Sequence, residues 1–141
     1  MKWIITIGLL GVVMLLVLLH DMFQKRSARK HMAGRPRRSA AEFGREFYPE
    51  RAEAASEIRD ILAKYIPVDL AQLEPSDQPV RDLHMDDLDS MATAEFIMTV
   101  EERFGIVVAE ADMEKLRTFD DIVRYVIAKR DQKEMENKRG L

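Results

Sequence analysis

The chain of 141 residues contains no cysteine. A disulfide framework, a thiolate zinc site and a cysteine nucleophile are therefore excluded, as is a lipid attached through cysteine. Histidine is also scarce: His20, His31 and His84 stand apart, and no His-x-x-Glu or paired spacing predicts a metal site. No Gly-x-Ser-x-Gly motif is present, so the sequence gives poor support for a serine hydrolase.

Acidic residues are absent from positions 24–38, which carry seven Lys and Arg. From position 39 onward the balance reverses, with 24 Asp and Glu against 14 Lys and Arg. We expect these two parts to have different partners. Nucleic acid is not favoured as a partner, because the basic part lacks interleaved aromatic residues and the acidic remainder would repel phosphate.

Residues 3–19 contain no charge, and residues 1–23 are predicted to form a single transmembrane anchor. A cleaved signal peptide is the main alternative, but only Lys2 precedes the apolar run and no small-residue cleavage site follows it. Seven basic residues flank the C-terminal side against one on the N-terminal side. The positive-inside rule therefore predicts an inner (cytoplasmic) membrane protein, single-pass, with its C-terminal domain in the cytoplasm.

Residues 24–48 read as a basic linker, which contains Gly34 and Pro36 and can attract anionic lipid headgroups. The aromatic residues Phe43, Phe47 and Tyr48 extend the following helix or pack beneath it, and the sequence leaves both open. Residues 131–141 form a charged tail, within a highly charged segment from 129 that is expected to be frayed or disordered.

Residues 49–130 show helical periodicity and no convincing strand. A first helix is predicted from about Pro49 to Ile66, before Pro67. A loop over 68–89 follows, with Leu70, Leu73, Val80 and Leu83 as apolar anchors; a loop this long is often functional. A brief helix over 110–116 and a last helix capped by Thr118 and Asp121 complete the pattern, with 106–108 as an apolar connector.

The second helix of this region is predicted over Ser90–Phe104, with Asp89 as its N-cap and Gly105 after its end. Its apolar face is expected to comprise Met91, Ala94, Ile97, Met98 and either Val100 or Phe104, with Phe96 to one side. The opposite face carries Glu95, Glu101, Glu102 and Arg103. The serine at the start of this helix has no histidine partner in sequence and no glycine elbow, so its hydroxyl is displayed and not self-activated, which suits a residue that another enzyme modifies.

From Asp89 to about Ala128 the chain resembles acyl carrier proteins and the related peptidyl and D-alanyl carrier domains. Asp89-Ser90-Met91, followed by Glu95 and by Glu101-Glu102-Arg103-Phe104, resembles the family's Asp-Ser-Leu motif and its Glu-Glu-x-Phe ending. The resemblance implies that Ser90 receives 4′-phosphopantetheine from coenzyme A, through a phosphopantetheinyl transferase. The thiol of that group then holds an acyl or aminoacyl cargo as a thioester, so the chain is expected to be a carrier and not an enzyme.

Two features depart from the family pattern. Asp87 stands where the family has glycine, and the expected leucine lies three residues early, at Leu83. A second register, in which Asp87 replaces the serine, would leave nothing to modify. The spacing to Glu95, Glu101 and Phe104 favours Ser90.

The resulting expectation is an all-α fold: a small four-helix bundle of acyl-carrier type with a long first loop, preceded by one transmembrane helix. Its partners would be the transferase, an acyl- or aminoacyl-loading enzyme, a membrane acyltransferase of lipid metabolism and the bilayer. Basic partner enzymes are expected to dock on the surface around the helix start, steered by its acidic residues. The expected docking residues are Asp89, Met91, Glu95, Met98, Glu101 and Glu102. Two alternatives remain open: an unmodified carrier-like structural adaptor in a membrane complex, and a regulator that acts through the basic linker alone.

Overall fold

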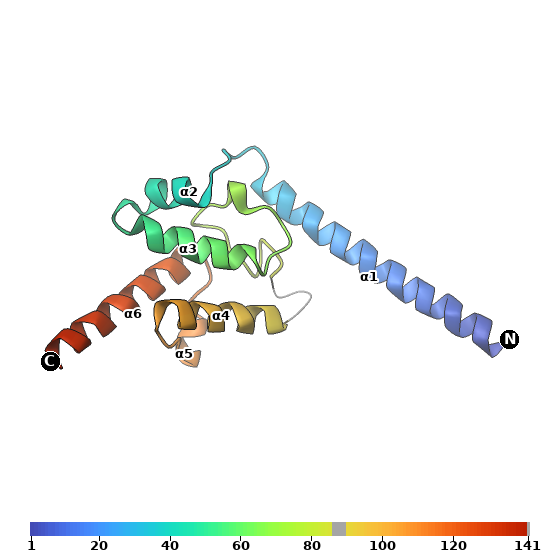
Figure 1. Cartoon of the computed structure of the whole chain (residues 1–141). Coiled ribbons are helices and arrows are strands. Elements are labelled where there is room, and N and C mark those ends of the chain that lie inside the picture. The colour runs from blue at the N-terminus through green and yellow to red at the C-terminus, as the bar shows by residue number, and fades with distance from the viewer. Residues whose placement is uncertain (86–89, 141) are drawn as a thin grey trace.

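A computed structural model describes residues 1–85 and 90–140, and these residues form helices and loops without a strand (Figure 1). The all-α expectation is confirmed. Two helices precede the region predicted as the bundle, α1 (Lys2–Met32) and α2 (Ala40–Phe47). The remaining elements are η1 (Pro49–Arg51), α3 (Ala52–Ala63), η2 (Leu70–Gln72), α4 (Ser90–Phe104), α5 (Glu110–Met113) and α6 (Phe119–Arg139).

Helix α1 projects from the bundle as one long rod (Figure 1). Every residue from 1 to 20 is exposed on it, including large side chains such as Trp3, Leu10 and Leu16. By length and composition it could cross a membrane, and it is the one helix of the described chain that could. Its burial begins only at Gln24 and continues at Ala28 and Met32, one residue in every turn.

Residues 24–48, predicted as a basic linker, are largely helical, because α1 continues to Met32 and α2 follows after seven residues. Local signals explain α2. Ser39 accepts a hydrogen bond from the backbone N–H of Glu42, and the Glu42 carboxylate accepts one from the backbone N–H of Ser39. This capping box satisfies two N–H groups of the helix start and lowers the pKa of the Glu42 carboxyl.

Helix α2 is part of the core and not a spacer. Phe43 is fully buried, and its ring lies 5.5 Å from that of Phe119 in an edge-to-face arrangement. Gly44 faces the carbonyl of Ala52, where an added Cβ would clash, so α2 and α3 approach closely only because this residue is glycine. Tyr48 donates a hydrogen bond of 2.7 Å to Asp120, and burial together with this bond raises its pKa well above the usual value.

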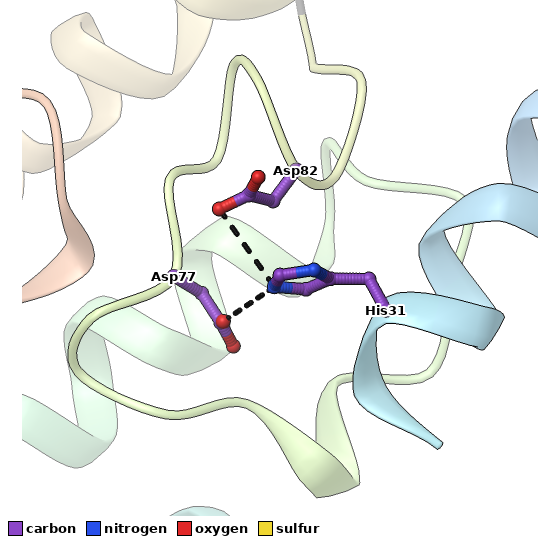
Figure 2. A group of neighbouring side chains, drawn as sticks. All are labelled: His31, Asp77 and Asp82. Carbon is purple, nitrogen blue, oxygen red and sulfur yellow. Dashed lines mark hydrogen bonds and ion pairs between the residues drawn. The ribbon is translucent and has the colours of Figure 1, made fainter.

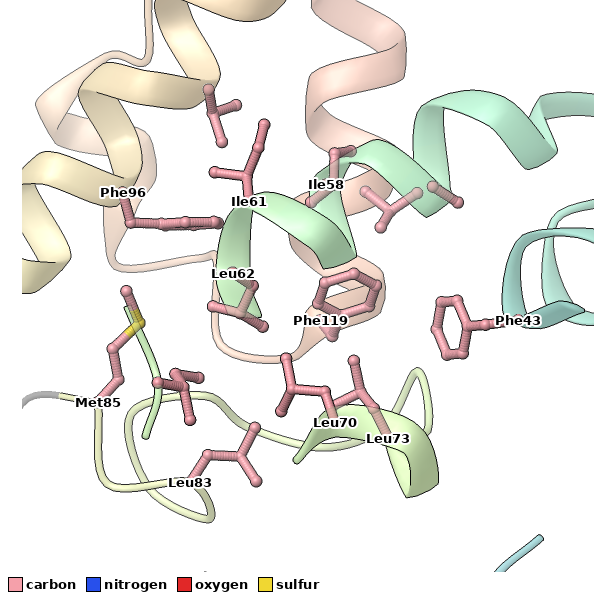
Figure 3. Close-up of a cluster of buried hydrophobic side chains, with 14 of the residues drawn as sticks. Phe43, Ile58, Ile61, Leu62, Leu70, Leu73, Leu83, Met85, Phe96 and Phe119 are labelled. Carbon is pink, nitrogen blue, oxygen red and sulfur yellow. The ribbon is translucent and has the colours of Figure 1, made fainter. Parts of the chain in front are cut away.

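The core lies between α2, α3, α4, the long loop and the first half of α6 (Figure 3). Helix α3 contributes Ile58, Ile61 and Leu62, all 6% exposed or less. Leu70, Leu73 and Leu83 of the loop are buried in this core, as predicted. Val80 differs, since it is 47% exposed.

The helix ends in this region agree with the sequence signals. Thr118 accepts from the backbone N–H of Asp121, and the Asp121 carboxylate accepts from that of Thr118. Gly105 has a φ of +61°, the left-handed conformation that ends α4. The segment 106–108 is a connector without strand structure, as predicted.

Helix α6 departs from the prediction of a frayed end and continues to Arg139. Ion pairs support this extension: Arg51 contacts Asp131 at 2.5 Å, and Arg130 lies 3.9 Å from Glu134 one turn along. Lys133 donates to the carbonyl of Gly105, which fixes the extension to the end of α4.

Candidate functional site

The predicted attachment residue, Ser90, is the first residue of α4. The structure describes its place in the helix and not its side chain. Asp86, Asp87 and Asp89 lie outside the described residues, so the predicted N-cap and the acidic loop remain sequence expectations.

The chemistry of a helix start fits a phosphodiester. Helix α4 is 15 residues long. The N–H groups in the first turn of such a helix cannot bond to carbonyls within it. They point along the axis at the positive end of the helix dipole, where a phosphate group is stabilised. The free backbone N–H groups at the start of α4 are therefore suited to bind the phosphate of phosphopantetheine.

An apolar pocket begins one turn after Ser90. It has a volume of about 120 Å³ and lies between the long loop, α4, α5 and α6. An apolar cavity of roughly 150 Å³ can hold benzene, so the pocket can shelter a short apolar segment and not a long chain in one piece. The loop contributes Pro79, Val80 and Met85, α4 contributes Thr93, Phe96, Ile97 and Val100, and the C-terminal part contributes Val108, Met113, Leu116, Arg117, Ile122, Tyr125 and Val126.

Polar groups at the edge of this pocket are paired with one another. The hydroxyl of Tyr125 donates to Asp112 at 3.0 Å and accepts from the backbone N–H of Ala109 at 3.3 Å. Hydrogen bonds from Lys115 and from Tyr125 lower the pKa of the Asp112 carboxyl. The carboxylate therefore remains ionised at the rim, and the apolar ring of Tyr125 faces the pocket.

The orientation of α4 corrects the predicted apolar face. Phe96, expected at one side, is the buried residue at 4% exposure, together with Val100 at 2%. Met91 and Met98 are 63% and 57% exposed. The reason lies just after the end of α3, because the ring of Tyr65, two residues beyond that helix, packs edge-to-face on Phe96, with 6.3 Å between ring centroids.

The outer face of α4 therefore presents Met91, Glu95, Met98 and Glu102, all exposed. Two thioethers beside two carboxylates can contact both apolar and basic groups of a partner. Glu101 has a different place. It is half-buried, and its carboxylate accepts a hydrogen bond of 2.7 Å from the backbone N–H of Val108, which holds the connector against α4.

A second cluster joins the end of α1 to the long loop (Figure 2). The Nε2 atom of His31 lies 2.9 Å from a carboxylate oxygen of Asp77 and 3.7 Å from one of Asp82. Arg35 donates to the other oxygen of Asp77 at 2.7 Å, and this bond raises the pKa of the Arg35 guanidinium. Local sequence spacing does not reveal the cluster, because His31 and Asp77 are 46 residues apart.

Comparisons with known proteins agree with this geometry. Residues 56–126 match the family described as "Phosphopantetheine attachment site". Over 70 residues the chain is 36% identical to an acyl carrier protein of Helicobacter pylori (strain G27), an alignment covering 50% of this chain and 86% of the relative. It is 33% identical over 70 residues to an acyl carrier protein of Chlamydia caviae, covering 50% and 87%.

The chain belongs to the acyl carrier protein family. It is therefore a carrier and not an enzyme, and 4′-phosphopantetheine, added by a phosphopantetheinyl transferase, is its covalent cofactor. Helices α1 and α2 lie outside the matched residues 56–126, as does the second half of α6. The carrier bundle thus has additions at both ends of the chain.

Proposed function

We propose that this carrier is modified on Ser90 and delivers an acyl or aminoacyl group to enzymes at a membrane. The position of Ser90 as first residue of α4, within the family match, is the observation that carries this proposal. In the bound state the cofactor supplies a thiol that holds the cargo as a thioester. The protein supplies the helix start that accommodates the phosphate and the pocket that shelters part of an apolar cargo.

The outer face of α4 is proposed as the docking surface for the transferase, the loading enzyme and the acceptor. Its exposed residues are Met91, Glu95, Met98 and Glu102, and Asp89 and Glu101 complete the proposed set. The carboxylates attract basic partner surfaces and raise the association rate. The methionines adapt their shape to several partners, which suits a carrier that must contact each in turn.

Helix α1 is proposed to anchor the carrier in the inner (cytoplasmic) membrane, with the bundle in the cytoplasm. The apolar helix and the basic residues that follow it support both parts of this proposal. The exposed side chains of Arg26, Arg29 and Lys30 can also contact anionic headgroups. Anchoring raises the effective concentration of cargo near membrane acyltransferases of lipid metabolism.

Intact-mass spectrometry after co-expression with a phosphopantetheinyl transferase tests the attachment site. We expect the full chain to gain the mass of one phosphopantetheine group and Ser90→Ala to gain none. Ser76→Ala is the matched control, because Ser76 is an exposed serine of the long loop that precedes α4. An unmodified parent chain, or modification that survives Ser90→Ala, would contradict the proposal. An unmodified parent chain would favour the structural adaptor.

Removal of residues 1–23 tests the anchoring separately. The shortened carrier should still be modified, because the family match begins at residue 56. It should leave the membrane fraction and lose cargo transfer to a membrane acceptor. Unchanged transfer by the shortened chain would disprove the role of the anchor and leave the Ser90 assignment intact.

A further inference from the structure

The cytoplasmic end of α1 is docked on the carrier bundle and does not project freely from it. Gln24, Ala28 and Met32 are 7%, 1% and 2% exposed, and they recur at intervals of four residues along one face of the helix. Side chains four residues apart lie above one another on an α-helix, so they form a continuous stripe. We call this stripe the docking face.

The cluster around Asp77 fixes the docking face to the bundle. The Asp77 side chain is 1% exposed, and a charge so deeply buried requires partners. His31 and Arg35 supply them from the end of α1 and the turn after it. On the other side, the carbonyl of Asp77 accepts a hydrogen bond of 2.8 Å from the backbone N–H of Phe119, at the start of α6. Asp77 therefore connects three parts of the chain: the end of α1, the long loop and the start of α6.

The docked loop lies close to the end of the apolar run. Asp21, Gln24 and Lys25 of α1 line one small cavity together with Leu83 and His84 of the loop. These α1 residues follow Leu19 by two to six positions, which is about 3 to 9 Å along a helix axis. The headgroup layer is about 5 to 8 Å thick on each side of a bilayer. With residues 3–19 in the hydrocarbon, Leu83 and His84 lie at headgroup level.

The start of α4 is next to this part of the loop. Met85 lines the apolar pocket together with Thr93 and Phe96, which lie in the first two turns of α4. Five peptide steps from Met85 to Ser90 span at most about 18 Å. Figure 1 shows the start of α4 on the side of the bundle that faces α1, and the end of α6 on the opposite side.

We propose that the docking face holds the attachment end of the bundle at the level of the lipid headgroups. This inference rests on the anchoring and on the Ser90 attachment proposed above, and it specifies the partner. The acceptor is an integral membrane enzyme whose active site opens at the bilayer surface, within reach of a short arm. A carrier on a flexible linker would have no such preference.

Single thiol probes test this orientation, because the chain has no cysteine of its own. Ala94→Cys lies one turn after Ser90, and Ala41→Cys lies at the start of α2; both alanines are exposed. Each full-length variant carries a donor dye and is inserted into nanodiscs of phosphatidylcholine and phosphatidylglycerol with acceptor-labelled headgroups. We expect energy transfer to be several-fold higher from position 94 than from position 41.

A matched pair of charge substitutions completes the test. Ala28→Glu places a carboxylate in the buried docking face, whereas Ser27→Glu places one on the exposed side of the same turn. The difference between positions 94 and 41 should be lost in Ala28→Glu and kept in Ser27→Glu. Equal transfer from both positions in the inserted parent chain, or a difference that survives Ala28→Glu, would overturn the inference. A chain that fails to insert would instead disprove the anchoring proposed above, and the inference with it.

Discussion

The two halves of α1 have the same secondary structure and opposite surroundings. Residues 1–20 are exposed on all sides, whereas from Gln24 onward one residue per turn is buried against the bundle. Residues 3–19 of the first half contain no charge, as the proposed membrane anchor requires. The second half carries charged residues on its exposed sides, and only the narrow stripe of Gln24, Ala28 and Met32 is buried against the bundle. One continuous helix can therefore combine the proposed membrane anchor with a docking element, because its sequence pattern changes between residues 20 and 24.

A charge in the first half should have the largest effect on this comparison. Leu10→Arg places a guanidinium near the centre of the apolar run, where insertion costs about 2.5 to 3.5 kcal/mol. We expect a marked shift of the chain out of the membrane fraction after carbonate extraction. Ser27→Arg, an exposed position of the second half, is the control and should remain in the membrane. Equal extraction of the two variants would contradict the division of α1 into two halves.

Truncation of a buried side chain in the second half should have a smaller effect. Met32→Ala removes a side chain that is 2% exposed, at an expected cost of about 2 kcal/mol to docking. That free energy corresponds to a roughly 25-fold rise in the undocked population. The alkylation rate of a thiol at Ala28→Cys measures it, because position 28 is buried only in the docked state.

Met22→Ala is the matched control for that measurement. Met22 is 66% exposed on the same helix, so its truncation should leave the alkylation rate at position 28 unchanged. If both methionine variants accelerate alkylation alike, the stripe at 24, 28 and 32 is not the surface that docks.

The smallest predicted effect is a change in the stability of the bundle that leaves the docking of α1 unchanged. It arises from the cap at the start of α6. Hydrogen bonds from the backbone N–H and the side chain of Thr118 lower the pKa of the Asp121 carboxyl. Stability from this cap is thus fully present above the unfolded pKa of about 3.9 and is lost as pH falls through the lower folded value. Asp121 is partly exposed, so the contribution is about 1 kcal/mol or less.

Thermal unfolding between pH 6 and pH 3 measures this contribution. The parent chain should lose more stability over that range than Asp121→Asn, whose side chain does not titrate. Alkylation at position 28 should not change with this substitution. A steeper pH dependence in Asp121→Asn would contradict the assigned role of the carboxylate.

Local signals predicted much of the fold. Thr118 with Asp121 marks the start of α6, and Gly105 marks the end of α4, because caps act on backbone groups a few residues away. The same reasoning applies to Ser39 and Glu42 at α2, a capping pair that lies within the predicted linker. That signal could have been found without the structure.

Long-range contacts explain what could not be predicted. The exposure of Met98 and the burial of Phe96 depend on Tyr65, which lies in the turn after α3. The role of Glu101 depends on the connector, whose residue Val108 donates a backbone hydrogen bond to its carboxylate. The pairing of His31 with Asp77 depends on the docking of α1 against a loop residue 46 positions later in the sequence. Sequence periodicity fixes which residues share a face and not which face meets the core.

The attachment of phosphopantetheine at Ser90 of a membrane-bound chain is the central claim, and one measurement tests it most directly. Trypsin releases residues 82–103 as one peptide, in which Ser90 is the single serine. Mass spectrometry of this peptide, prepared from the membrane fraction of the native host, should show the phosphopantetheine group on Ser90, free or bearing cargo. A peptide that is unmodified in every preparation, or a modified chain that is found in the soluble fraction, would contradict the account.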